Sequence, residues 1–301
     1  MSKIRSAILA SFVADSLALG AHWEYDRERI TRELGRVDRL LAPRLNTHHA
    51  GKEAGDLSHY GDQTLLLLEA VAETGDFSLS RFAARWQQMM VHYNGYMDRA
   101  SRDALTRFTE GLPPDKTGAV TSDFSGASRV APLLAVLGDH EDRLAAAARA
   151  QCLMTHGSVL VADGAEFMAR AAHALLQGQN VPQALATAAG ADYAQLPAQD
   201  WLAFADMHAA LEGCEAVSRF GQACGMKGAF MSVVHLAVRY ENAPAEALVE
   251  NVMGGGDSCA RGLALGMLLG ARHGQDWIPV HWLSGLRSRN AVEECFTRLW
   301  R

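Results

Sequence analysis

The stretch NVMGGGDSCARGLALGMLLGARHG, residues 251–274, places three glycines directly before an acidic residue and a run of small and apolar side chains. Within that run, Gly262, Gly266 and Gly270 recur every four residues, a spacing that allows a neighbouring helix to approach closely. Close helix packing is one sufficient explanation of the pattern. The position of Asp257 favours a second explanation, a binding site at the start of this helix. The N-terminus of a helix offers unpaired N–H groups and a positive dipole to an anion or a metal-bridged phosphate.

A second acidic motif, YGDQT at residues 60–64, precedes the apolar run LLLLEAV. Asp62 is expected near the N-terminus of that helix, so the chain presents two carboxylates in the same way from distant parts of the sequence. The two motifs together favour a site between two helix starts over helix packing alone.

The spacing of apolar residues predicts an all-α fold. They recur at three and four positions along nearly the whole chain, as in amphipathic helices. Glycine and Gly-Pro breakers separate the segments, and alternating strand patterns between Asn-Gly or Asp-Gly turns are missing from the sequence. We expect one compact domain of many helices spanning residues 1–301. The expected helical segments are roughly 3–20, 64–74, 79–93, 97–110, 129–137, 141–154, 158–177, 181–190, 198–212, 223–240, 244–252 and 257–272.

Composition excludes several classes of protein. The net charge is −6 and no basic stripe with interleaved aromatic residues occurs, so nucleic acid is not an expected partner. Five cysteines without a Cys-x-x-Cys pair favour a reducing cytoplasm over a disulfide framework. Asp15 interrupts the faintly signal-like N-terminus, and no long uncharged apolar stretch predicts a membrane span. The oligomeric state stays open.

Two irregular segments, 43–63 and 111–128, are polar, glycine-rich and long for connections in a helical domain. Loops of this length often carry function. The first contains His48, His49 and His59, but the ligand spacing typical of zinc sites is absent. A zinc site is therefore not the favoured interpretation of these histidines.

Five short motifs occur in order along the chain: ADSLALGAHWE at 14–24, YGDQT at 60–64, SGASRVAP at 125–132, TH at 155–156 and GGDSCA at 255–260. In that order they resemble the motifs of the ADP-ribosylglycohydrolase family, namely its opening Asp-to-Glu helix, YTDDT, a Gly-Ser/Ala-x-x-Arg-x-x-Pro loop, Thr-His and GGDTDT. The sequences HWEYD (residues 22–26) and GDQT (residues 61–64) are most similar to those of the branch that includes the J1 crystallins. The resemblance implies an all-helical, orthogonally packed fold with two divalent metal ions, usually magnesium or manganese, acting on an ADP-ribosyl glycosidic bond.

The chain departs from the family at the implied metal ligands. Residues 61–63 read GDQ where the family has TDD, and residues 257–260 read DSCA where it has DTDT. Magnesium prefers hard oxygen ligands in near-octahedral geometry, and these changes remove two carboxylates and two hydroxyls. We therefore expect a degraded site that holds one magnesium ion at most, or none.

Carried over by position, the resemblance implies three catalytic carboxylates, Glu24, Asp62 and Asp257. Glu24 would transfer a proton, while Asp62 and Asp257 would hold water or an ion together with Ser258. The implied substrate-binding residues are Gln63, Thr64, Gly126, Ser128, His156, Gly255, Gly256 and Cys259. The implied function is hydrolysis of an N- or O-glycosidic bond of an ADP-ribosylated or related ribosyl substrate. The alternative is a non-catalytic ADP-ribose or nucleotide binder, or a crystallin-like structural relative.

Several single residues have two interpretations. Cys259 at a helix start could be a nucleophile of lowered pKa or a small core residue. His156 could contact substrate or serve as a hydrogen-bonded core residue. Trp23 and Tyr25 could line a pocket for an aromatic ring or pack in the core. Arg129 could pair with a surface carboxylate or help the loop before it to bind a diphosphate.

Overall fold

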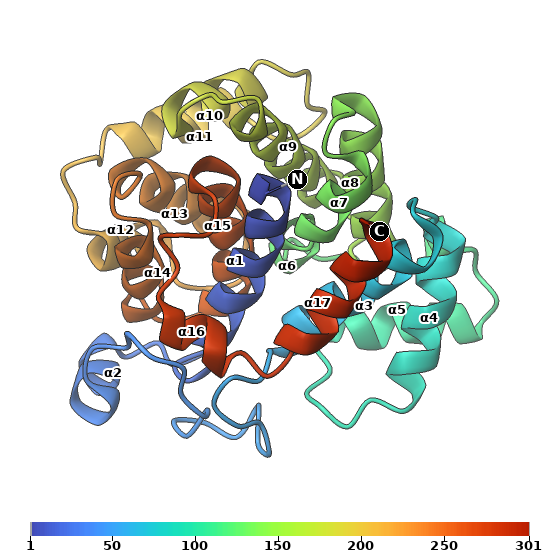
Figure 1. Cartoon of the computed structure of the whole chain (residues 1–301), viewed down its shortest axis with the longest axis horizontal. Helices are drawn as coiled ribbons and strands as arrows, with labels where there is room; N and C mark the ends of the chain where they lie inside the picture. The colour runs from blue at the N-terminus through green and yellow to red at the C-terminus, as the bar shows by residue number, and fades with distance from the viewer. Residues whose placement is uncertain (1, 301) are drawn as a thin grey trace.

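The computed structural model describes residues 2–300, in which nearly all regular structure is helical (Figure 1). Within these residues no β-sheet forms, and two isolated bridges join Ala119 to His156 and Asp123 to Gly225. The α-helices are α1 (Ser2–Leu19), α2 (Arg27–Leu34), α3 (His59–Thr74), α4 (Leu79–Val91), α5 (Arg99–Thr109), α6 (Ser125–Ser128), α7 (Leu134–Leu137), α8 (Glu141–Thr155), α9 (Val159–Leu176), α10 (Val181–Ala189), α11 (Ala198–Asp206), α12 (Gly213–Phe220), α13 (Met226–Arg239), α14 (Pro244–Met253), α15 (Ser258–His273), α16 (Val280–Gly285) and α17 (Arg289–Leu299). The short 3₁₀ helices are η1 (Pro114–Lys116) and η2 (Ala131–Leu133).

Helices α1 and α15 lie side by side at the centre of the molecule, and the other helices surround them (Figure 1). From residue 6 to its end α1 is buried, and α15 is buried from its first residue through residue 271. A helix that is buried all round must be apolar on every face, which is why neither sequence shows a polar stripe. This central pair forms one compact all-α body with the surrounding helices.

Small residues set the distance between these two helices. A Cβ on Gly262 would lie 2.9 Å from the carbonyl oxygen of Ala14, and one on Gly266 would lie 2.3 Å from that of Ala10. A Cβ on Gly270 would likewise lie 2.5 Å from the carbonyl oxygen of Ser6. The glycines spaced four residues apart thus serve the packing of α15 against α1. They all lie after the first turn of α15, so that turn can form part of a site.

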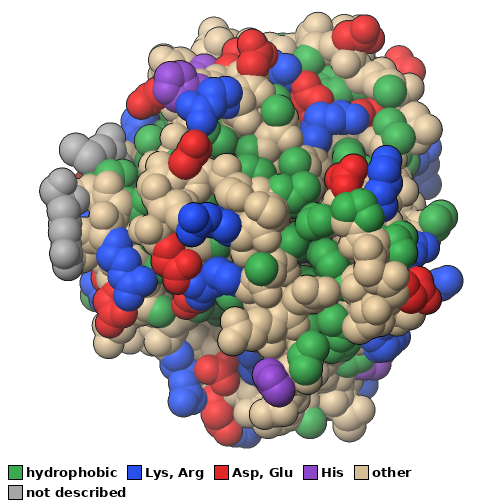
Figure 2. Space-filling view, turned by 90° about the vertical axis from the view of Figure 1, so that its right-hand side faces the viewer, with side chains coloured by type: hydrophobic (Ala, Val, Ile, Leu, Met, Phe, Trp, Pro, Cys, Tyr) green, Lys and Arg blue, Asp and Glu red, His purple; other side chains and the backbone are tan. Residues whose placement is uncertain are grey.

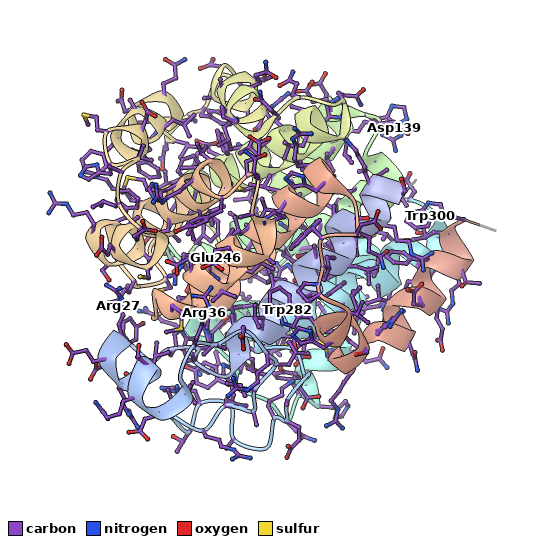
Figure 3. All side chains as sticks on the ribbon, turned by 60° about the vertical axis from the view of Figure 1, so that its left-hand side comes forward. Arg27, Arg36, Asp139, Glu246, Trp282 and Trp300 are labelled. Carbon is purple, nitrogen blue, oxygen red and sulfur yellow. The ribbon has the colours of Figure 1, made fainter. Side chains whose placement is uncertain are left out.

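The irregular segment 35–58 is tied to the helical body at both of its flanks. Arg36 forms an ion pair with Glu246 of α14, and the indole Nε1 of Trp282 in α16 donates to the carbonyl of Asp38 at 2.6 Å. Figure 3 shows Arg36, Glu246 and Trp282 on neighbouring elements. These contacts hold a long loop against the ends of α1 and α3, where the acidic motifs lie.

Most expected helices are confirmed, with shifted ends. Helix α3 begins at His59, because the Ser58 side chain accepts from the backbone N–H groups of Tyr60 and Gly61. The expected helix 129–137 is instead the short pair η2 and α7, and the expected helices 198–212 and 223–240 are α11 and α13, each shorter. Five α-helices were not predicted: α2, α6, α12, α16 and α17.

Among residues 2–300, no helix combines the length and apolar character needed to cross a bilayer. Figure 2 shows a face of the molecule on which acidic and basic side chains are interspersed. Many of the surface charges form ion pairs, such as Arg143 with Asp76 and Arg239 with Glu212.

Candidate functional site

Two loops meet at the start of α15. Trp23 donates its backbone N–H to the carbonyl of Gly256 at 2.8 Å, and Gly256 donates to the carbonyl of Glu24 at 2.7 Å. Gly255 and Gly256 have φ values of 70° and 68°, and a Cβ on Gly256 would lie 2.1 Å from the carbonyl oxygen of Gln222. Glycine is required here both for the left-handed backbone and for the close approach of the neighbouring chain.

The buried side chain of Arg261 holds this loop in place through hydrogen bonds. Its guanidinium is fully buried and donates to the carbonyls of Gly255 at 2.5 Å and Gln222 at 3.2 Å, and to Asn251 Oδ1 at 2.9 Å. Gln222 in turn accepts the backbone N–H of Asp257 at 2.8 Å. The backbone that carries Asp257 is therefore held rigidly from both sides.

Asp257 is the most perturbed carboxyl of the site. It is 1% exposed, its Oδ2 accepts from the Tyr60 hydroxyl at 3.3 Å, and its Oδ1 has no hydrogen-bond partner among residues 2–300. Burial, followed by the nearby charge of Asp123, raises the pKa of Asp257 to about 8, against an opposing effect of Arg261. Asp257 consequently carries a proton at neutral pH.

Asp123 and Cys224 converge on Asp257. The carboxylate oxygens of the two aspartates and the Cys224 sulfur lie within 4.8 Å of one another. Asp123 is held by the backbone N–H of Ser125 at 2.9 Å, and a backbone hydrogen bond from Phe124 to Cys224 joins the two loops. The sequence indicated only that the polar loop 111–128 could be functional, and it gave no signal for Cys224.

Asp62 and Asp257 have different hydrogen-bond partners in the structure. Asp62 Oδ2 accepts from Lys52 Nζ at 2.6 Å and from the Tyr93 hydroxyl at 2.5 Å, whereas Tyr60, two residues earlier on α3, points to Asp257. Residues two apart on a helix face different sides, which explains the divergence. Within residues 2–300, neither cluster of metal-ligand-type side chains includes Asp62.

Glu24 is placed beside the glycine loop by its backbone, but its carboxylate is already paired. Oε2 accepts from Arg29 Nη1 at 2.7 Å and Oε1 accepts from the backbone N–H of Asp26 at 2.9 Å. The charge of Glu24 is thus balanced at the edge of the site.

Gln63 points into the protein core. Its Oε1 accepts from Trp86 Nε1 at 2.8 Å and Arg129 Nη1 at 2.9 Å, and its Nε2 donates to Ser101 Oγ at 3.2 Å. Thr64 is also buried, with its hydroxyl donating to the carbonyl of Tyr60 at 2.8 Å. The side chains of both residues are thus engaged in hydrogen bonds within the interior.

Arg129 belongs to this same buried network, contrary to its interpretation as a partner of a surface carboxylate. Its Nε donates to Gln151 Oε1 at 2.8 Å and its Nη2 donates to Thr155 Oγ1 at 2.9 Å, with only 4% of the residue exposed. Burial lowers the pKa of Arg129 to about 10. The guanidinium therefore does not pair with a surface carboxylate, and its hydrogen bonds fix α6 against α8.

His156 and the loop 125–128 form one wall of the site. His156 Nε2 hydrogen-bonds with Ser125 Oγ at 3.0 Å and Nδ1 with Thr155 Oγ1 at 2.9 Å, while burial lowers its pKa. A Cβ on Gly126 would lie 2.6 Å from the His156 ring, so this glycine permits close approach. Ser128 donates its hydroxyl to the carbonyl of Ser125 at 2.9 Å. His156 is a hydrogen-bonded residue of the wall with both ring nitrogens engaged.

The nucleophile interpretation of Cys259 is wrong. The residue is fully buried, its Sγ lies 3.5 Å from the carbonyl of Asp15, and burial with two nearby acidic groups raises its pKa well above the ordinary value. A thiol in that state is inert. Ser258, the neighbouring residue proposed as a metal ligand, is buried with its hydroxyl unpartnered within the described chain.

Trp23 is the one non-glycine residue with positive φ in residues 2–300, at 61°. A bulky residue in that region is strained and such strain gathers at functional sites. Its ring stacks on His22 with centroids 4.4 Å apart, whereas Tyr25 is 49% exposed. Trp23 therefore packs in an aromatic cluster, and Tyr25 lies at the rim facing solvent.

The side chains at the family's metal positions do not fit a two-magnesium centre. The Lys52 ammonium contacts the Asp62 carboxylate directly, Gln63 Oε1 is occupied by two donors, and Cys259 is a buried thiol. Magnesium needs several hard oxygen ligands around one point, and these positions do not supply them.

Comparisons with known proteins show the family and the fold of this chain. The model of the ADP-ribosylglycohydrolase family matches residues 1–301. Crystallin J1A of Tripedalia cystophora is 23% identical over 96% of this chain and 94% of its own length, and an uncharacterized protein of Archaeoglobus fulgidus is 24% identical over 99% and 96%. A solved structure described as an ADP-ribosylglycohydrolase-related protein complex shares the fold, with a TM-score of 0.72, 21% identity and coverage of 100% of this chain and 97% of that one. The chain thus belongs to the ADP-ribosylglycohydrolase family.

Proposed function

We propose that this protein hydrolyses an N- or O-glycosidic bond of an ADP-ribosylated or related ribosyl substrate. Membership of the ADP-ribosylglycohydrolase family suggests glycohydrolase activity. The observation that carries the proposal for this chain is the convergence of the partly exposed Asp123 on the buried Asp257, which is protonated at neutral pH. Glycosidases use a protonated carboxyl group together with a second carboxyl group at the bond that they cleave.

Each carboxyl has a distinct role in the proposed reaction. Asp257 donates its proton to the nitrogen or oxygen that leaves as the bond to the anomeric carbon breaks. Asp123 stabilises the oxocarbenium-like transition state and takes a proton from the water whose hydroxyl adds to that carbon. The proton then returns to Asp257, so the cycle is balanced.

The remaining predicted residues position these two groups. Tyr60 donates to Asp257, while the loops of Gly126 and Gly256 hold the walls of the site close together. We assign Glu24 and Asp62 a supporting role, since Arg29 and Lys52 balance their charges. The proposed reaction uses one ion at most, or none.

A non-catalytic role is the second candidate. Crystallin J1A and Crystallin J1B of Tripedalia cystophora are each 23% identical to this chain, over 96% and 97% of it. The changed ligand positions and the core-directed Gln63 are consistent with a relative that binds ADP-ribose without cleaving it, or that has a purely structural role.

The test is release of ADP-ribose from two peptides, one ADP-ribosylated on arginine through nitrogen and one on serine through oxygen. We expect turnover of at least one peptide by the wild type, undiminished by EDTA. Asp257→Asn and Asp123→Asn should each lower turnover at least about 100-fold, the usual scale of general acid–base catalysis. Asp139→Asn, at an exposed position in the turn before α8, is the matched control and should keep wild-type turnover.

Two results would decide against hydrolysis. Folded wild type that binds ADP-ribose in calorimetry but cleaves neither peptide, with or without magnesium, supports the binding role. Folded wild type that neither binds nor cleaves supports the structural role.

A further inference from the structure

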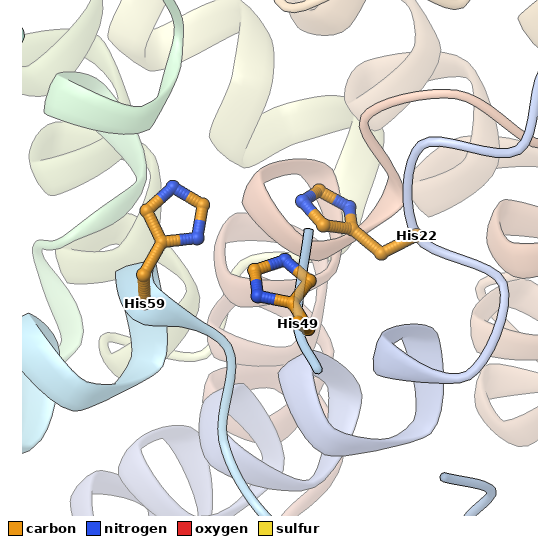
Figure 4. Close-up of side chains that lie close together, drawn as sticks. All are labelled: His22, His49 and His59. Carbon is orange, nitrogen blue, oxygen red and sulfur yellow. The ribbon is translucent and has the colours of Figure 1, made fainter. Parts of the chain in front are cut away.

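Three histidines from separate structural elements meet beside Asp257. His22 follows α1, His49 lies in the irregular segment 35–58, and His59 is the first residue of α3. Each residue presents a ring nitrogen such that the three nitrogens lie within 4.8 Å of one another. Figure 4 shows the three rings around a common space, with a nitrogen of each directed into it.

These rings are buried and their nitrogens lack partners. His22, His49 and His59 are 1%, 2% and 0% exposed. Within residues 2–300, Nε2 of His22 and both ring nitrogens of His49 and His59 have no hydrogen-bond partner. Five buried nitrogens without partners are costly, since each loses its hydration without compensation.

A hydrogen-bonding explanation does not remove this cost. Trp23 and Tyr60 surround the cluster with ring faces and edges, at centroid distances of 5.3 Å and 3.8 Å from His59. Aromatic faces pack well against imidazole but leave the in-plane lone pairs unsatisfied. A ligand that accepts several nitrogen lone pairs at one point would satisfy them together.

We propose that His22, His49 and His59 form a binding site for one divalent transition-metal ion of the zinc class. Imidazole nitrogen is a preferred ligand of zinc, and three protein ligands leave a fourth position for water. Its three ligands differ from the acidic positions that the family resemblance assigns to magnesium, although Asp257 of that set lies beside His22, and the proposal does not depend on the proposed hydrolase activity.

Two carboxylates stand where the second shell of such a site requires them. Asp98 Oδ2 lies 3.4 Å from His59 Nε2, and Asp257 Oδ1, which has no other partner, lies 3.7 Å from His22 Nδ1. Histidine ligands usually direct their second nitrogen to a carboxylate, which orients the ring and fixes its tautomer. Asp98 thus lies where a small shift would let it accept from His59, while His22 Nδ1 lies near Asp257 and also accepts the backbone N–H of Cys259 at 3.4 Å.

The charge balance also suits a cation. Asp98 supplies a carboxylate beside His59, while Lys52, whose charge acts on His49, is paired with Asp62. Burial and the neighbouring histidines lower the pKa of His22 well below its ordinary value and that of His49 to about 3. The rings of His22 and His49 are therefore neutral at pH 7, the form in which imidazole binds metals.

The test is zinc binding by the full-length protein after treatment with EDTA and dialysis. Calorimetry with zinc chloride in excess magnesium should give one zinc per chain, because magnesium does not compete for imidazole sites. Cobalt(II) should give the visible absorption of a tetrahedral nitrogen-ligated ion, and zinc should raise the melting temperature.

The variants compare adjacent histidines. His49→Ala should abolish this zinc binding, whereas His48→Ala, at the exposed neighbouring position, should retain it. Asp98→Asn should weaken zinc binding by about 10- to 100-fold, the usual cost of losing a second-shell partner, while still capping α5 at Ser101.

Three outcomes would overturn the proposal. They are folded wild type that takes up no zinc in the presence of magnesium, equal zinc binding by His49→Ala and wild type, and a cobalt spectrum typical of octahedral oxygen ligation. His49 lies outside any helix, so its replacement tests the site without removing a helical contact. The cobalt spectrum of the wild type decides the question even if a variant fails to fold.

Discussion

Replacing Asp257 by asparagine should abolish turnover and at the same time stabilise the fold. The pKa of this buried carboxyl is raised from 3.8 to about 8, so between those values the folded protein holds a proton that the unfolded chain has released. Stability therefore falls as the pH rises through that window. At pH 7 the difference spans about three pH units, which corresponds to a cost of about 4 kcal/mol as an upper limit.

Asparagine is neutral in both states and so avoids this cost, and its amide oxygen can still accept from Tyr60. We expect Asp257→Asn to be more stable than wild type at about pH 7, by up to about 4 kcal/mol, with the difference vanishing near about pH 4. Urea unfolding followed by far-ultraviolet circular dichroism at the two pH values measures it.

Asp163→Asn is the matched control, because the same substitution should act in the opposite direction. Asp163 is also buried, but it pairs with Arg149 at 2.5 Å and accepts from the backbone of Gln195 at 2.6 Å. Its loss should destabilise the protein by on the order of 3 kcal/mol. Our reasoning is refuted if Asp257→Asn is no more stable than wild type at neutral pH, or if the difference does not change with pH.

Three further predictions follow from the same contacts. Turnover should be retained below and lost above about pH 8, because Asp257 must be protonated to donate; a kcat/KM that rises through this range would contradict its role. Gly256→Ala should destabilise the fold by about 1–3 kcal/mol in urea unfolding, since its φ is 68°, and wild-type stability would show that the loop relaxes easily. Gln63→Ala should cost about 1–3 kcal/mol by leaving the buried Arg129 and Trp86 donors unpaired, a loss that Gln63→Glu should largely avoid; equal losses in both variants would refute the hydrogen-bond argument.

Local patterns in the sequence predicted the helices that bury apolar side chains along one face or on all faces. Helices α1, α9 and α15 were predicted because apolar residues repeat at helical spacing. Helix α2 was missed because its single buried residue is Ile30, so it has almost no apolar pattern and depends on its Asp26 cap. In α17, Val292, Cys295 and Phe296 did carry the pattern, but over too short a stretch to be recognised.

The sequence located the loops of the site better than it assigned their side chains. Asp257, Gly255 and Gly256 were recognised because glycines before a helix start have a local cause. The opposite directions of Tyr60 and Asp62 depend on how α3 is rotated against α15, which no local pattern encodes. The partners of Asp257 were missed for the same reason, since Asp123 and Cys224 come from loops about 100 residues apart that only the packed fold brings together.

The sequence by itself determined the all-α class, the family resemblance and the loss of the usual magnesium ligands, because residue types, their periodicity and motif order are properties of the chain alone. The tertiary structure decided which side chains share a space. It paired Asp62 with Lys52, directed Gln63 and Arg129 into the core, and gathered His22 beside His49 and His59. The physical reason is that a helix fixes only its own faces, whereas convergence between distant segments depends on how those faces pack.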